Sequence, residues 1–210
     1  MTSYVPSGVE WIGDIPEGWT VKPLFAVGEE RRETNKGLRN DNLLSLSYGE
    51  VVEKDINTGE GLLPESFETY QVIHPNDLVF RFTDLQNDKR SLRSAISSHN
   101  GIITSAYMAF TPTKCNPNYL AYLLRAYDHS KVFYAMGSGL RQSLKFSDVK
   151  RLPILLPPAS EQDEIVAFLD SEIAQIDALI AKQEQLIESL RERRRALIVA
   201  VSTGKIDARG

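Results

Sequence analysis

The feature that most constrains how this chain folds is a run of apolar residues, spaced as heptads, in its last third. No proline or glycine occurs between Pro158 and Gly204, and apolar residues recur there at alternating intervals of four and three for about five heptads. This spacing predicts one long α-helix with an apolar stripe. The seam along which such a helix would pair with another consists of Ile165, Leu169, Ile176, Leu179, Gln183, Leu186, Leu190 and Leu197.

The ends of this helix are also marked in the sequence. Pro157 and Pro158 end the preceding segment, Ser160 is the predicted N-cap, and Gly204 is the predicted stop. A helix of this length measures roughly 60 Å, which is too long for its stripe to be buried against residues 1–158 alone. We therefore expect it to pair with a partner helix.

Polar residues interrupt the apolar seam at Glu172, Gln183 and Arg193. Such interruptions lower the stability of a coiled coil and often fix its register or orientation. In an antiparallel homodimer centred near Gln183, Glu172 of one copy would lie close to Arg193 of the other. The seam therefore suggests antiparallel pairing, although parallel pairing is also compatible with it.

The net charge of −4 conceals an uneven distribution of charge along the chain. Residues 81–151 carry eleven Lys and Arg against four Asp and Glu, a net charge of +7, whereas residues 1–80 carry −8 and residues 152–210 carry −3. A basic surface of this size attracts polyanions through counterion release. The alternative is a solvated surface that is basic by chance.

The rest of the chain has the pattern of a globular domain, and the predicted fold class is α+β. We expect a mixed α/β domain over 1–158, a long coiled-coil helix over 159–203 and a tail over 204–210. A helix is predicted after Pro117, over about 118–135, because its apolar residues share one face. Alternating strand formers and turn signals predict strands over 43–52, 70–73, 77–83, 102–110 and 150–156.

Two polar loops inside the basic stretch are the candidate DNA-binding segments: the first loop (86–93) and the second loop (137–145). Arg pairs with guanine and Gln or Asn with adenine, whereas Lys, Ser and backbone N–H groups hold phosphates. Composition alone leaves open that both are ordinary solvated loops. The candidate contacts are Gln86, Asn87, Lys89, Arg90, Ser91, Arg93, Ser138, Arg141, Gln142, Ser143 and Lys145.

Signatures of catalysis are absent or weak. The phosphate-binding loop, the dinucleotide fingerprint and the serine-hydrolase elbow all fail to match. The three histidines are scattered, and the single cysteine, Cys115, has no companion ligands for a metal. We therefore expect no catalytic residue, no metal site and no cofactor in this chain. A nuclease with an unfamiliar site at Asp77 or Asp148 remains an alternative.

The cellular compartment is inferred from what the sequence lacks. The first nineteen residues have neither a basic nor an apolar region of the kind found in signal peptides. No apolar run reaches the length of a membrane span. A single cysteine is compatible with a reducing environment. We expect a cytoplasmic protein that does not associate with membranes.

Several short motifs occur along the chain: residues 8–19, 72–80, 101–107, 117–120, 152–158 and 161–165. In their order and spacing, these motifs resemble the DNA-specificity (S) subunits of type I restriction–modification systems. The opening segment contains Gly-Val-Glu-Trp-Ile-Gly-Asp-Ile-Pro-Glu-Gly-Trp, and the most specific motif is Leu-Pro-Ile-Leu-Leu-Pro-Pro followed by Glu-Gln-Asp-Glu-Ile. The order and spacing of the motifs match a target-recognition domain joined to a long helix.

The resemblance implies a non-catalytic subunit that binds double-stranded DNA and docks modification (methyltransferase) subunits. It also makes a restriction subunit a candidate partner, and it assigns the cofactor S-adenosylmethionine to the modification subunit. One departure from the family is evident, because members usually carry two recognition domains and two long helices. This chain looks like a half-size form, so an antiparallel homodimer would read a bipartite, palindromic target. A coiled-coil adaptor that binds only proteins is the main alternative.

Overall fold

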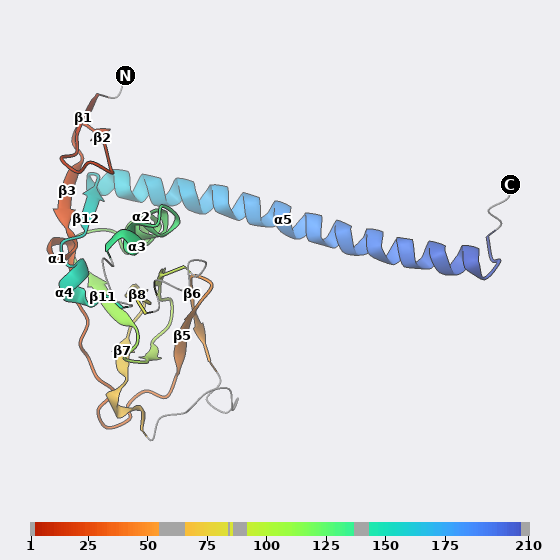
Figure 1. The fold of residues 1–210 in the computed structure, drawn as a ribbon, viewed down its shortest axis with the longest axis horizontal. Coiled ribbons are helices and arrows are strands. Elements are labelled where there is room, and N and C mark those ends of the chain that lie inside the picture. The colour runs from red at the N-terminus through yellow and green to blue at the C-terminus, as the bar shows by residue number, and fades with distance from the viewer. Residues whose placement is uncertain (1–2, 55–65, 84, 86–91, 137–142, 207–210) are drawn as a thin grey trace. The chain divides into compact units, whose positions relative to one another are not determined.

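The computed structural model describes residues 3–54, 66–83, 85, 92–136 and 143–206. The chain divides into two compact units, Met1–Val166 and Ala167–Gly210. The first unit is a β-rich domain with short helices, and the second is almost entirely one helix (Figure 1). The predicted α+β fold class, a mixed domain followed by a long C-terminal helix, is confirmed.

The elements of the first unit are short. Its strands are β1 (Tyr4–Pro6), β2 (Asp14–Pro16), β3 (Thr20–Pro23), β4 (Gly28–Glu30), β5 (Leu44–Ser47), β6 (Glu50–Glu53), β7 (Gln71–Ile73), β8 (Leu78–Phe80), β9 (Ser94–Ile96), β10 (Gly101–Ile103), β11 (Met108–Pro112) and β12 (Pro153–Leu156). Its helices are α1 (Leu24–Val27), the 3-10 helix η1 (Phe67–Thr69), α2 (Pro117–His129), α3 (Val132–Met136) and α4 (Phe146–Val149).

A four-stranded antiparallel sheet in the order β4-β11-β8-β9 organises the domain. Its strand β8 is buried at every position, because it supplies side chains to a core on each face of the sheet. Side chains alternate across a strand, so Leu78 and Phe80 enter one core while Val79 enters the other. The first core includes α2, α3 and β12, and the second is closed by the β5–β6 hairpin together with β7 and β10.

Three predicted elements differ from the observed ones at identifiable residues. The predicted strand 43–52 is a hairpin, because Tyr48 (φ 49°) and Gly49 (φ 83°) adopt the left-handed conformations of a two-residue turn. The predicted strand 102–110 is two strands, separated by a turn in which the Tyr107 amide donates to the Thr104 carbonyl. The predicted helix 118–135 is interrupted by Lys131, whose φ of 60° ends α2 before α3 begins.

The long helix α5 spans Ala159–Ser202, in agreement with the prediction. Its N-cap differs from the prediction, because the Gln162 amide already donates to the Pro158 carbonyl at 3.0 Å; Ser160 therefore lies inside the helix and is not its N-cap. Its end is as predicted. Gly204 has φ of 72°, and the Lys205 amide returns to the Ala200 carbonyl at 2.8 Å, which is a Schellman motif.

The first turns of α5 are tied to the domain by polar contacts within the first unit. The buried Gln162 side chain accepts a hydrogen bond from the Asn116 amide and donates one to the Pro157 carbonyl. The Trp19 indole N–H donates to the Glu161 carboxylate at 3.0 Å. These contacts come from segments that are far apart in sequence, so they hold the start of the helix in place on the domain.

Asp77 is the most highly connected carboxylate among the described residues. Its side chain is 1% exposed and forms an ion pair with Arg31, with 2.5 Å between Nε and Oδ2. It also accepts hydrogen bonds from the Thr111 hydroxyl and from the His74 amide. These partners lie on the chain after β4, on β11 and before β8, so one carboxylate links three segments of the domain.

We predict that Asp77→Ala destabilises the domain by about 3 kcal/mol, because the largely buried Arg31 guanidinium would lose its partner. Arg32→Ala is the matched control, since Arg32 is 81% exposed and pairs with Glu30 at the surface; it should cost about 1 kcal/mol or less. Urea denaturation followed by circular dichroism measures both. Equal losses in the two variants would contradict this assignment.

Candidate DNA interface

The structure tests the two candidate loops only in part. Among the candidate contacts, Arg93, Ser143 and Lys145 are described. The others lie outside the described residues and remain predictions: Gln86, Asn87, Lys89, Arg90, Ser91, Ser138, Arg141 and Gln142.

The points at which the two loops join the domain meet in the structure. Thr83, just before the first loop, forms an antiparallel bridge with Ser143 in the second loop, although the two residues are far apart in sequence. The Leu144 amide donates a hydrogen bond to the Phe82 carbonyl at 3.1 Å. We call this contact the loop joint. Two segments that the sequence could only treat separately are therefore anchored at one place.

The residues at the loop joint alternate between core and solvent. Ser143 and Lys145 are exposed, whereas Leu144 between them is buried in the same core as Phe82. The Lys145 amide donates to the Asp148 carboxylate at 2.9 Å at the start of α4, which fixes the backbone there. A fixed backbone with an exposed lysine and hydroxyl has the chemistry of a phosphate-binding position.

Arg93 does not have the exposed position that was predicted for it. It is 0% exposed, and its guanidinium donates to the Thr83 carbonyl at 3.0 Å and to the Tyr134 hydroxyl at 3.2 Å. The Tyr134 ring also lies 5.5 Å from the guanidinium carbon. The structure therefore gives Arg93 a buried, structural position, and its role as a DNA contact stays a prediction.

Asp128 is a buried carboxylate next to Arg93. Its carboxylate accepts hydrogen bonds from the backbone amides of Arg93 and Ser94. Burial raises the pKa of this carboxyl, while the two backbone hydrogen bonds and the nearby Arg125 and Arg93 act in the opposite direction. This network lies where Arg93 leads into β9.

Arg125 connects the network to the β5–β6 hairpin. Its guanidinium donates to the Gly49 carbonyl at 2.5 Å and to the Ser94 carbonyl at 3.2 Å. The neighbouring Tyr48 is 96% exposed at the hairpin tip. The sequence did not point to this contact, because Arg125 and Gly49 come from elements with no shared motif.

A hollow of about 210 Å³ opens beside the loop joint, and sequence reasoning missed it as well. Phe82, Leu144 and Lys145 from the joint contribute to its wall. Its complete lining is Glu30, Gln71, Phe82, Ser105, Ala106, Tyr107, Met108, Leu144, Lys145 and Phe146. The lining combines aromatic rings with amide, hydroxyl and ammonium groups and the Glu30 carboxylate.

The two carboxylates considered for a nuclease both have structural contacts. Asp77 is buried in its ion pair with Arg31, and Asp148 holds the start of α4. Within the described ranges, no group of three or more His, Cys, Asp and Glu is placed to hold a metal ion. The helices of the described part of the chain also include none long and apolar enough to cross a membrane.

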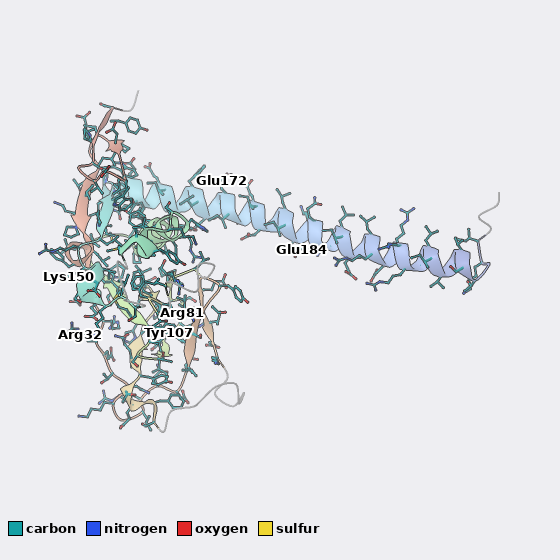
Figure 2. All side chains as sticks on the ribbon, viewed as in Figure 1. Arg32, Arg81, Tyr107, Lys150, Glu172 and Glu184 are labelled. Carbon is teal, nitrogen blue, oxygen red and sulfur yellow. The ribbon has the colours of Figure 1, made fainter. Side chains whose placement is uncertain are left out.

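The predicted seam residues of α5 include a series of large apolar side chains that are about half exposed or more. Leu186 is 52% exposed and Leu179 is 58% exposed. Side chains project along the whole helix, and Glu172 and Glu184 mark two of its polar positions (Figure 2). The other exposed apolar seam residues are Ile176, Leu190 and Leu197.

A comparison with family models matches residues 94–189 to the type I restriction modification DNA specificity domain. The matched segment begins at Ser94, next to the buried Arg93, includes the second loop and extends far into α5. It therefore covers one of the two candidate loops and the junction to the helix.

Similar curated proteins are specificity subunits of type I restriction enzymes. The StySPI subunit of Salmonella potsdam and the EcoKI subunit of Escherichia coli are each 24% identical over 92% of this chain and 44% of their own length. The putative MjaX subunit of Methanocaldococcus jannaschii is 24% identical over 91% of this chain and 47% of its own. The chain thus spans less than half the length of these relatives.

Solved structures show a similar fold. A chain from a structure of type I R-M complex assembly and conformational transition has a TM-score of 0.60 at 19% identity, over 90% of this chain and 46% of that chain. The HsdS subunit of Thermoanaerobacter tengcongensis has a TM-score of 0.54 at 18% identity, over 86% and 42%. The family model, the relatives and the solved structures agree, and together they show that this chain is similar to type I restriction–modification specificity subunits.

Proposed function

We propose that this chain is the sequence-specific DNA-recognition subunit of a type I restriction–modification methyltransferase complex. The observation that carries the proposal is the loop joint, where Thr83 and Ser143 bring together the bases of two loops rich in basic and amide side chains. Two such loops anchored at one place can act on the same duplex, with Arg, Gln and Asn reading bases and Lys and Ser holding phosphates.

The proposed role is recognition without catalysis. Methyl transfer would reside in modification subunits that bind S-adenosylmethionine, and cleavage would reside in a restriction subunit where one joins the complex. The assignment is supported by the names of the relatives and by the structural roles of Asp77 and Asp148. Such a complex would act in the cytoplasm, where the DNA is.

We further propose that α5 pairs with α5 of a second copy in antiparallel orientation. The exposed apolar seam is one support, and the charge along the helix is the other. From Ala159 to Leu179 the helix carries six acidic residues and no Lys or Arg, whereas from Ile180 to Ser202 it carries five Lys and Arg against three acidic residues. Antiparallel pairing places each acidic half beside a basic half, while parallel pairing places like charges together.

A symmetric pair of this kind determines the symmetry of its target. Two identical recognition domains related by a twofold axis would read the same half-site on opposite strands. The target would be a palindrome interrupted by a spacer that neither domain reads.

The first test is methylome sequencing of a methylation-free host that expresses this chain with its modification subunit. We predict a single modified motif consisting of two inverted half-sites separated by an unspecified spacer. The modification subunit expressed alone is the control and should leave the genome unmodified. Modification without any shared motif would refute sequence recognition, and an asymmetric motif would refute the homodimer.

A second prediction separates phosphate contacts from base contacts. Because Lys145 is exposed at the loop joint, Lys145→Ala should weaken binding of the complex to target and scrambled duplexes alike, and should reduce the slope of log K against log salt by about 1. Arg141→Ala should instead cost about 1–3 kcal/mol on the target only. Fluorescence anisotropy over a range of salt concentrations measures both. An adaptor that binds only proteins would be unaffected by either substitution.

The dimer prediction has a matched pair of variants on neighbouring residues. Leu186→Glu should raise the dissociation constant of the dimer roughly a hundredfold or more, because two buried leucine side chains are lost from each dimer. Gln185→Glu adds the same charge off the seam and should leave the dimer intact. Size-exclusion chromatography with light scattering reports the mass of one or two chains. Wild-type protein that stays monomeric at micromolar concentration would contradict the dimer.

A further inference from the structure

We propose that Arg93 is a positioning residue that fixes the two DNA-reading loops relative to each other. The inference rests on the proposed function of these loops and goes beyond it, because it concerns a residue that is buried within the protein. Arg93 is 0% exposed, and its guanidinium has protein partners on two other segments.

The partners of Arg93 are the residues from which the loops leave the domain. Its Nη1 donates to the carbonyl of Thr83, which precedes the first loop, while Arg93 itself ends that loop. Its Nε donates to the hydroxyl of Tyr134 on α3, just before the second loop. Ser143, in the second loop, is bridged to Thr83. One guanidinium and one β-bridge therefore connect the entry and exit of both loops.

The chemistry of this position calls for arginine. The planar guanidinium donates in several fixed directions at once, whereas an ammonium group is a point charge that cannot span the same partners. Its face stacks near the Tyr134 ring, with 5.5 Å from the guanidinium carbon to the ring centroid. The Asp128 carboxylate accepts hydrogen bonds from the backbone amides of Arg93 and Ser94. The backbone of Arg93 is therefore held in place as well as its side chain.

Burying such a group without a structural purpose is unfavourable, since a charge taken out of water is rarely repaid by its contacts alone. An apolar residue of similar volume would fill the same core. An arginine in this position instead fixes the hydrogen-bond directions toward the Thr83 carbonyl and the Tyr134 hydroxyl. The distance between the starts of the two loops then depends on a rigid group. Sequence reading depends on this geometry, because a base contact tolerates little displacement.

The test compares four variants within the complete complex formed with the modification subunit. Arg93→Met removes the guanidinium, Arg93→Lys keeps its charge, and Tyr134→Phe removes one hydroxyl while leaving the ring. Arg31→Met is the control, because it removes a largely buried arginine from a different ion pair, with Asp77. Two quantities are measured for each: the ratio of affinities for target and scrambled duplexes, and amide hydrogen exchange.

Arg93→Met and Arg93→Lys should each lower the affinity ratio roughly tenfold, as for the loss of one base contact. Affinity for the scrambled duplex should stay within about twofold, because phosphate attraction depends on charge more than on register. The Leu144 amide should exchange roughly tenfold faster, while the Val79 amide in the sheet centre stays protected. Tyr134→Phe should show the same changes at smaller amplitude, and it remains informative where Arg93→Met does not fold.

Three results would overturn the inference. One is an unchanged affinity ratio together with unchanged Leu144 exchange. Another is an equal loss of affinity for both duplexes, which indicates a charge effect. The third is the same loss of ratio in Arg31→Met, which indicates general instability. If the wild-type complex prefers no duplex, the proposed function fails, and Leu144 exchange still decides whether Arg93 holds the loop joint.

Discussion

Strand β8 is buried on both faces of its sheet, and the rest of the domain is arranged around that constraint. Leu78 and Phe80 require a core on one side, and Val79 requires another on the other side. The helices α2 and α3 supply the first core, and the β5–β6 hairpin helps to close the second. The chain that leaves β8 then runs through Phe82 to Thr83 at the loop joint, so the position of the joint follows from the burial of the strand.

The charged groups of the domain fall into a buried set and an exposed set. Inside the domain, Asp77 forms an ion pair with Arg31, and Asp128 accepts hydrogen bonds from the backbone amides of Arg93 and Ser94. At the surface, exposed polar groups such as Lys145 lie where the backbone is fixed by a hydrogen bond to Asp148 in α4. The division separates residues that hold the frame from residues that are free to meet a polyanion. Arg93 belongs to the first group, although its sequence context suggested the second.

Much of the architecture could be predicted from the sequence because it depends on periodicity. The heptad pattern gave α5 almost to the residue, and the apolar runs located β7, β8 and β12. Predictions failed where one residue adopts an unusual backbone conformation, as at Tyr48 and Lys131, since a left-handed tyrosine or lysine has no pattern in the sequence. The loop joint and the burial of Arg93 were out of reach for another reason. Both depend on contacts between segments far apart in the chain, and local composition carries no information about them.

The loop joint also bears on how a protein of this kind can change over evolutionary time. Among the described residues, the loop joint and its supports involve Thr83, Arg93, Tyr134 and Leu144, which all lie outside 86–91 and 137–142. Substitutions inside those segments would leave these four residues unchanged. If the proposed function holds, a frame whose described residues lie outside the candidate reading segments would let new sequence preferences arise by local mutation.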